Sequence, residues 1–117
     1  MLISVLKSKL HRARVTDANV DYEGSLTLSE ELMKLVEIVP YERIVVGNMA
    51  NGERFETYVI PGTRNGGEVC LNGATAHLGK VGDLLTIMSF TLVEPEMAAS
   101  HKPKIITLSR NNQPVKS

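Results

Sequence analysis

Pairs of residues that favour tight turns interrupt this chain at short intervals, at Asn51-Gly52, Pro61-Gly62, Gly66-Gly67 and Gly82-Asp83. The apolar stretches around these turns are short or alternate with polar residues, which is typical of strands. Strands are predicted at residues 2–17, 44–46, 53–60, 68–71, 84–93 and 104–108. Short strands leave exposed edges unless the sheet closes on itself. The spacing therefore predicts a mainly β protein, in the form of a small closed barrel.

One longer segment has the repeat of a helix. Apolar residues recur at i, i+3, i+4 and i+7 as Leu32, Leu35, Val36 and Val39, and Pro40 ends the run. We expect this stripe to face the core, with either Thr27 (paired with Glu30) or Ser29 as the N-cap. A second helical turn is predicted within residues 94–100, because Pro95 suits a first helical turn. Residues 109–117 have little apolar content and are predicted to form a flexible tail.

The length and charge balance restrict the class of protein. A chain of 117 residues without a repeat or linker is expected to form a single domain over residues 1–117. Thirteen basic residues balance thirteen acidic ones, which removes the positive field of a general nucleic-acid binder. Zero net charge also protects weakly against self-association, so an oligomer is expected.

Signatures of membranes, metals and nucleotides are absent from the sequence. No apolar run approaches the roughly 18 residues that span a bilayer. The three histidines lie far apart, and the glycines form no phosphate-binding pattern, so we expect neither a metal nor a nucleotide. Cys70 is the single cysteine, which excludes an intrachain disulfide and favours a cytoplasmic location. With apolar neighbours on both sides, Cys70 is expected to be a buried small residue.

Residues 7–14 hold the main cluster of basic residues. On a regular strand, Lys7, Lys9 and His11 would share one face, and Arg12 and Arg14 the other. A solvated strand is the ordinary interpretation of such a cluster.

The Gly24-Ser25 bond stands out on chemical grounds. Glycine adopts backbone conformations that are closed to other residues, so a bend at this bond can direct the serine hydroxyl at the preceding carbonyl. Gly-Ser is common in loops, and by itself the pair indicates only a turn.

Four segments, which occur in a fixed order along the chain, favour a functional interpretation of this Gly-Ser pair. They are Lys9-Leu10-His11, Tyr22-Glu23-Gly24-Ser25, Asn51-Gly52-Glu53-Arg54-Phe55-Glu56-Thr57-Tyr58 and Asn72-Gly73-Ala74-Thr75-Ala76-His77. The ordered set resembles the bacterial pyruvoyl-dependent aspartate 1-decarboxylase family, from about Met1 to Val93. This resemblance implies a double-psi β-barrel, assembled as a homotetramer with active sites near subunit contacts. It also implies conversion of L-aspartate to β-alanine and CO₂, for pantothenate and coenzyme A synthesis.

The resemblance implies that Ser25 is a latent cofactor. Its hydroxyl would attack the Gly24 carbonyl to form an ester, and loss of the Ser25 α-proton would then expel Gly24 as a carboxylate. Hydration and release of ammonia would leave a pyruvoyl group at the start of residues 25–117, separated from residues 1–24. Such a carbonyl condenses with the substrate amine and accepts the electrons left by CO₂. Whether cleavage needs a helper protein is left open.

The resemblance also implies roles in cleavage and catalysis. Gly24 and Ser25 form the scissile bond. Thr57 would support the tetrahedral intermediate of cleavage, and Asn72 would donate a hydrogen bond to its oxyanion. Tyr58 would return a proton to the decarboxylated carbon.

Substrate binding would involve a second group of residues. Arg54 would hold a substrate carboxylate through paired hydrogen bonds. Lys9 would lie near the pyruvoyl group or the substrate charge, and Thr57 would contribute its hydroxyl. Gly73 and Ala74 would let the substrate approach the backbone. On a regular strand Arg54 faces the same side as Tyr58, and Thr57 faces the other.

The chain departs from many relatives at three positions. Gly47 stands where they carry Trp, Glu56 where they carry a small residue, and Thr75 where they carry Ala. Because Gly47 leaves a gap in the pocket wall, a pyruvoyl-dependent decarboxylase of another acidic amino acid is one alternative. The other is an uncleaved barrel that binds an anionic partner through its basic cluster.

Overall fold

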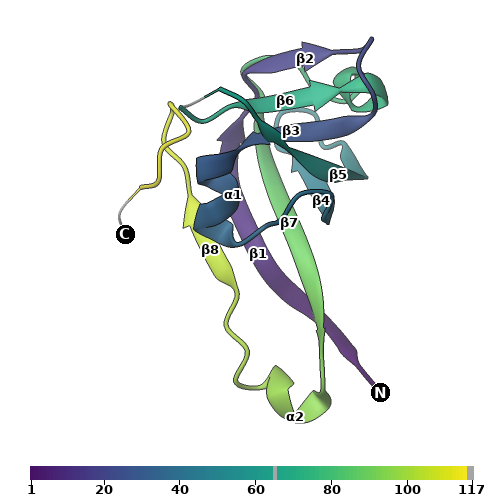
Figure 1. Ribbon diagram of the computed structural model, residues 1–117, viewed down its shortest axis with the longest axis vertical. Coiled ribbons are helices and arrows are strands. Elements are labelled where there is room, and N and C mark those ends of the chain that lie inside the picture. Colours follow the sequence, from purple (N-terminus) through teal and green to yellow (C-terminus); the bar gives the residue numbers. More distant parts are fainter. Residues whose placement is uncertain (65, 116–117) are drawn as a thin grey trace.

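The computed structural model describes residues 1–64 and 66–115, which form one coiled sheet of eight strands (Figure 1). Their order across the sheet is β2-β6-β3-β5-β4-β7-β1-β8. The strands are β1 (Ile3–Arg14), β2 (Asp17–Asn19), β3 (Ser25–Ser29), β4 (Arg43–Asn48), β5 (Arg54–Gly62), β6 (Val69–Asn72), β7 (Leu84–Val93) and β8 (Lys104–Thr107). The helices are α1 (Glu30–Val36), α2 (Pro95–Ala98) and a 3₁₀ helix, η1 (Gly73–His77). The predicted mainly β class with short helices is confirmed.

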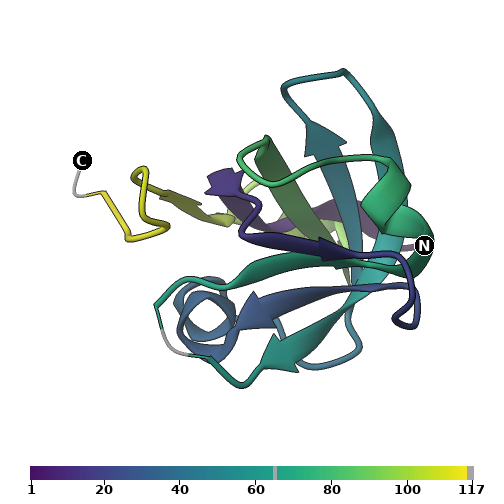
Figure 2. The same ribbon diagram turned by 90° about the horizontal axis from the view of Figure 1, so that it is seen from above.

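A short connection curls the sheet into a barrel. β1 lies near one end of the strand order and β2 at the other, yet only Val15 and Thr16 join them. The Thr16 amide donates to the Val69 carbonyl at 2.8 Å, and the Val15 amide donates to the Asp83 carbonyl at 2.9 Å. The ends of the sheet must therefore approach each other, and the strands wrap around a common core (Figure 2). Among the described residues, no strand pairing closes the ladder between β2 and β8.

Alternating side chains of the strands fill this core. Leu26 and Leu28 of β3 and Ile44 and Val46 of β4 are fully buried, and so is Ile87 of β7. In a strand, the residues between such positions point to the opposite side of the sheet, which we call the outer face. The outer face carries the polar residues discussed below.

The hairpin between β4 and β5 has the predicted position. Asn51-Gly52 lies in its turn, and Gly52 has a φ of +77°, which glycine adopts without strain. The pairing runs without a register shift from Arg43 opposite Tyr58 to Gly47 opposite Arg54.

Helix α1 is shorter than the apolar repeat predicts. Ser29 is the N-cap, and its hydroxyl accepts from the Leu32 amide at 3.3 Å. Glu37 adopts a left-handed conformation and ends the helix before Pro40. Val39 therefore lies beyond the helix and is 58% exposed, so its predicted place in the core is wrong.

Two bulges in β1 change the predicted faces of the basic cluster. The register shifts between Leu6 and Ser8 and again between His11 and Ala13, and Arg12 has a φ of +66°. The second bulge returns Arg14 to the outer face, so the prediction that Arg12 and Arg14 share the opposite face is wrong.

Two cations of this cluster are held by the protein itself. Lys7 Nζ lies 2.9 Å from Glu42 Oε1, and Arg14 Nη1 donates to the Gly82 carbonyl at 2.9 Å. The cluster is therefore not a uniform cationic surface.

The end of the chain packs against the barrel, contrary to the predicted tail. Asn112 is only 2% exposed. Its Nδ2 donates to the carbonyls of Arg14 and Gly67 at 2.8 Å each, and its Oδ1 accepts from the Arg14 amide at 2.8 Å. One polar side chain thus anchors a segment with little apolar content, and the prediction is corrected for residues 109–115. Residues 116–117 lie outside the described residues.

Candidate active site

Ser25 begins β3, immediately after the loop that follows β2. It pairs with Asn72 of β6 and is only 1% exposed. Asn72 Nδ2 donates to Ser25 Oγ at 3.0 Å, and Ser25 Oγ donates to the Glu23 carbonyl at 3.3 Å. The structure therefore brings Asn72 into contact with the Ser25 hydroxyl; among the described hydrogen bonds, Asn72 donates to Ser25 Oγ and not to the Gly24 carbonyl, where the oxyanion of the predicted role would form.

Gly73 lies against the segment that precedes Ser25. It has a φ of +61°, and a Cβ built there would lie 2.7 Å from Gly24 Cα, Gly24 N and the Tyr22 carbonyl oxygen. Any side chain at this position would push residues 22–24 away. Gly73 therefore fits the loop before the scissile bond, in addition to the substrate role that the resemblance implies.

Gly73 begins η1 (Gly73–His77), which the sequence did not predict. Thr75 is 7% exposed, and its hydroxyl donates to the Asn72 carbonyl at 2.7 Å and lies 3.3 Å from the Ser25 carbonyl oxygen. Ala74 is exposed on the same helix. The departure at Thr75 thus adds a hydroxyl beside Ser25. One signal in the sequence indicated this contact: the hydroxyl residue Thr75 stands two positions after the Asn72-Gly73 pair.

Strand β5 places the other predicted residues in alternation. Leu26 pairs with Val59, so Ser25 lies beside Tyr58 on the outer face. The half-buried Tyr58 ring lies 6.1 Å from the ring of Tyr41, measured between centroids. Thr57 pairs with the fully buried Ile44 and points to the core side, as the alternation predicts. The structure therefore does not bring Thr57 onto the outer face with Ser25.

Arg54 and Lys9 share a hollow of about 330 Å³ on the outer face. Gly47, Thr86 and Met88 also line it. Arg54 pairs with Gly47, whose position has no atom within 4 Å of a built Cβ, so the predicted gap in the wall is present. Glu53 also lines the hollow, so two cations face one carboxylate there, and the remaining positive charge suits an anionic ligand.

Glu56 takes no part in this hollow. Its carboxylate accepts from Arg43 Nη2 at 2.5 Å and from Arg43 Nε at 3.3 Å, in an exposed ion pair. The carboxylate of Glu56, which distinguishes this chain from many relatives, is therefore paired with the Arg43 guanidinium on the neighbouring strand β4.

Within one chain the predicted residues form two separate groups. Ser25, Asn72 and Gly73 lie beside the middle of β5, near Tyr58, and Lys9 and Arg54 lie at the start of this strand. Tyr58 is four positions along β5 from Arg54, which corresponds to about 13 Å along a strand. The geometry of one chain alone thus places the scissile bond away from the cationic hollow.

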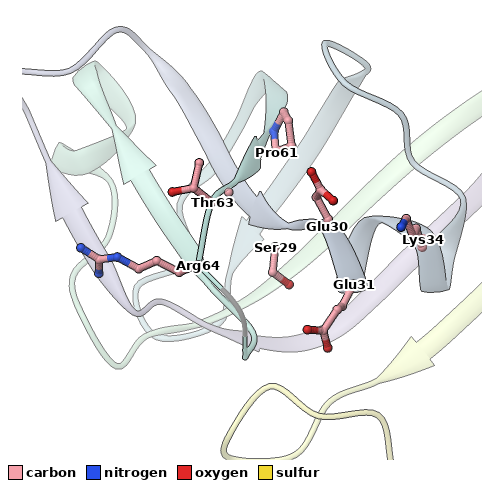
Figure 3. A pocket seen from close by; sticks show the side chains of 8 residues that line it. Ser29, Glu30, Glu31, Lys34, Pro61, Thr63 and Arg64 are labelled. Carbon is pink, nitrogen blue, oxygen red and sulfur yellow. The ribbon is translucent and has the colours of Figure 1, made fainter.

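A larger hollow lies outside both groups. It measures about 400 Å³, and Figure 3 shows the side chains that line it, beside the start of α1. Arg64 points away from Glu30 and Glu31 in this view. None of the predicted site residues lines it, so size alone does not identify the site.

The pKa values of two groups depart from their usual range. Burial raises the pKa of the Cys70 thiol, with further contributions from the charges of Asp17 and Glu68. The hydrogen bond from Asn48 lowers the pKa of Asp83. Among residues 1–64 and 66–115, no group of three or more His, Cys, Asp or Glu side chains is arranged to hold a metal ion. In the same part of the chain, no helix has the length and apolarity needed to cross a membrane.

Comparisons with known proteins identify the family of this chain. The family model described as aspartate decarboxylase matches residues 1–115. The aspartate 1-decarboxylase of Caldicellulosiruptor saccharolyticus is 53% identical over 116 residues, which cover 99% of this chain and 91% of the relative. That of Coprothermobacter proteolyticus is 52% identical over 116 residues, or 99% and 97%. That of Thermoanaerobacter pseudethanolicus is 49% identical over 111 residues, or 95% of each.

The fold and the buried serine define a small β-barrel protein with a candidate site beside a Gly-Ser bond. The matches over nearly the full length show that the chain belongs to the aspartate decarboxylase family, whose fold is the double-psi barrel. The resemblance that the sequence predicted is confirmed.

Proposed function

We propose that this protein decarboxylates L-aspartate to β-alanine and CO₂, in the synthesis of pantothenate and coenzyme A. Membership of the family supports the reaction. The observation that carries the mechanism is the buried Ser25 hydroxyl, which follows Gly24 and accepts a hydrogen bond from Asn72 Nδ2 at 3.0 Å.

The residues around Ser25 fit a pyruvoyl group made from this serine. Cleavage and loss of ammonia shorten the residue, so the product fits in the space that Ser25 fills. Asn72 Nδ2 and the Thr75 hydroxyl are donors close to Ser25 oxygens, at 3.0 and 3.3 Å. A pyruvoyl group supplies an electron-accepting carbonyl for decarboxylation. The nearby donors of the chain are of the type that holds such carbonyl oxygens.

Self-cleavage would begin with an acyl shift from nitrogen to oxygen. Ser25 Oγ bonds to the Gly24 carbonyl carbon, the bond from this carbon to Ser25 N breaks, and the hydroxyl proton ends on that nitrogen. Asn72 Nδ2 donates to Oγ and so stabilises negative charge as the proton leaves. Gly73, without a side chain, allows residues 22–24 to lie close to η1.

Substrate binding would use the cationic hollow. Arg54 offers a planar pair of N–H groups to a carboxylate, and Lys9 adds a second positive charge. Tyr58 lies beside Ser25, and its hydroxyl would donate a proton to the carbon that loses CO₂. Ala74 is exposed near Ser25, where a substrate can approach, whereas Gly73 is buried against residues 22–24 in the uncleaved chain.

Assembly would bring the two groups together. We infer a homotetramer in which the cationic hollow of one subunit faces Ser25 of another, because one chain separates them along β5. Apolar side chains that need a partner are exposed around the ends of β1 and β7. They include Ile3 at 38%, Phe90 at 41%, Leu92 at 62% and Met97 at 59% exposed. A cytoplasmic location fits the single reduced cysteine.

An intact-mass measurement on the purified protein tests this function. We expect two fragments, residues 1–24 and 25–117, the larger one lighter by one ammonia than a chain that starts with serine. Ser25→Ala should remain whole and produce no β-alanine from L-aspartate. Comparing L-aspartate with L-glutamate as substrate tests the alternative that the gap at Gly47 admits a larger acid. Rapid β-alanine formation by an uncleaved chain would overturn the mechanism.

A further inference from the structure

Ser25 belongs to a square of four polar side chains on the outer face. In the antiparallel pairing of β3 with β6, Ser25 lies opposite Asn72 and Thr27 lies opposite Cys70. Residues two apart on a strand point to the same side, so all four side chains meet. Ser25, Cys70 and Asn72 are 1%, 7% and 3% exposed. Thr27 is half-buried, and Thr27, Cys70 and Asn72 border a hollow of about 210 Å³. The square is therefore a largely buried polar cluster directly beside the scissile bond.

Asn72 forms hydrogen bonds with the other three members of this square. One Nδ2 hydrogen points to Ser25 Oγ at 3.0 Å and the other to Thr27 Oγ1 at 2.8 Å. On the other side of the amide, Cys70 Sγ donates to Asn72 Oδ1 at 3.1 Å. Three neighbours thus use both donors and the acceptor of the amide.

The Cys70 thiol determines which way this amide points. Sulfur is a weak acceptor, so a flipped amide would lose its contact with Cys70 and direct Oδ1 at Ser25 Oγ. Burial and the charges of Asp17 and Glu68 raise the pKa of the thiol, against the opposing charge of Arg64, so the thiol keeps its proton at neutral pH. The donor needed by Asn72 Oδ1 is therefore present.

Thr27 completes the arrangement from the other strand. Its hydroxyl accepts the second Nδ2 hydrogen at the shorter of the two distances, which fixes the amide plane. An amide held at two points cannot turn about its last bond without breaking both contacts. Its remaining N–H then stays directed at Ser25.

We propose that Cys70 and Thr27 are positioning residues for self-cleavage, because they hold the Asn72 amide with an N–H directed at Ser25 Oγ. The inference rests on the proposed self-cleavage and extends it to two residues whose described side-chain hydrogen bonds reach Asn72 and not Gly24 or Ser25. In the acyl shift, the orientation matters because Oγ gives up its proton while it bonds to the Gly24 carbonyl carbon. A donor at that moment stabilises the charge, whereas a carbonyl oxygen would repel it.

Two matched pairs of variants test the proposal. Cys70→Ala removes the donor to Asn72 and Cys70→Ser retains one, while Thr27→Val removes the acceptor and Thr27→Ser retains it. Full-length precursor is purified soon after brief expression, and the rate of cleavage is followed by intact mass. We expect Cys70→Ala and Thr27→Val to cleave about tenfold more slowly, and the two serine variants to remain within about threefold of wild type.

Thermal melting separates positioning from folding. The same substitutions are made in a Ser25→Ala background, which stays uncleaved, so that stability is compared without cleavage. Slow cleavage in a variant with an unchanged melting temperature, rescued by serine at the same position, supports the proposal. Equal cleavage rates within either pair would overturn it. If the wild-type chain does not cleave at all, the proposed function fails, and this inference fails with it.

Discussion

Replacing Gly73 by alanine should slow self-cleavage while the barrel still folds. The new Cβ would lie 2.7 Å from backbone atoms of Tyr22 and Gly24, and ordinary contact begins at 3.4 Å. The segment before Ser25 must therefore withdraw by about 0.7 Å. A misplacement of about 1 Å at reacting atoms can reduce a rate by about 100-fold. We expect cleavage of Gly73→Ala to be about 10 to 100 times slower.

Backbone strain must be separated from this contact. Gly73 has a φ of +61°. An alanine held in this left-handed conformation costs about 1–2 kcal/mol of backbone strain, whatever its neighbours are. Gly82→Ala is the matched control, because Gly82 has a φ of +96° and no atom within 4 Å of a built Cβ. The two precursors are purified side by side, and the fraction cleaved is followed by intact mass. If Gly73→Ala cleaves within twofold of Gly82→Ala, the close approach of residue 73 does not matter to cleavage.

Three further changes test the substrate site, the charge network and the 3₁₀ helix. Arg54→Lys should leave self-cleavage intact and lower kcat/KM for L-aspartate about tenfold or more, since an ammonium cannot form paired hydrogen bonds; unchanged turnover of fully cleaved protein would remove Arg54 from this role. Asp83 has a lowered pKa because Asn48 donates to it at 3.0 Å, so its carboxylate stabilises the fold above the unfolded-state pKa, and this contribution is lost as the pH falls through the folded-state pKa. Melting curves of Asp83→Asn should therefore depend less on pH in this acidic range than those of wild type, and parallel curves would contradict the assignment. Thr75→Ala should lower the free energy of unfolding by about 1 kcal/mol through loss of the bond to the Asn72 carbonyl, as measured by urea denaturation, and no change would show that this bond is not stabilising.

Local patterns in the sequence predict six of the eight described strands and miss β2 and β3, the strand that begins with Ser25. The run from Leu84 to Val93 matches β7 at both ends, and the Asn51-Gly52 turn lies between β4 and β5. Such segments are governed by alternation and turn chemistry, which act over a few residues. Thr57 also points away from Arg54 and Tyr58, as regular alternation requires, since β5 pairs with β4 without a shift.

Long-range contacts account for the errors. The three-residue strand β2 has no apolar pattern and exists because it pairs with β6. Asn112 orders the chain end through partners about 45 and 98 residues away in the sequence. Neither kind of contact has a signature in neighbouring residues, so local reasoning predicts a loop and a tail.

In the candidate site, too, the residues could be predicted from the sequence, whereas the contacts between them could not. The resemblance supplied Ser25 and Asn72, and the structure places them in contact. Cys70 is buried as predicted, yet its hydrogen bond to Asn72 requires knowing that the two lie on one face of β6. Its apolar neighbours suggested only packing, because a hydrogen bond is a property of the folded pair.

The position of the proposed cut has a consequence for the finished protein. Residues 1–24 include all of β1, which pairs with β7 and β8, and all of β2, which pairs with β6. Cleavage in the loop before β3 would therefore leave the smaller fragment paired with three strands of the larger one, β6, β7 and β8. The two fragments would stay associated without a covalent link, as the halves of a split protein do. Because Lys9 belongs to this piece, the mature enzyme would be a two-component assembly in which neither component alone carries the full set of reactive groups.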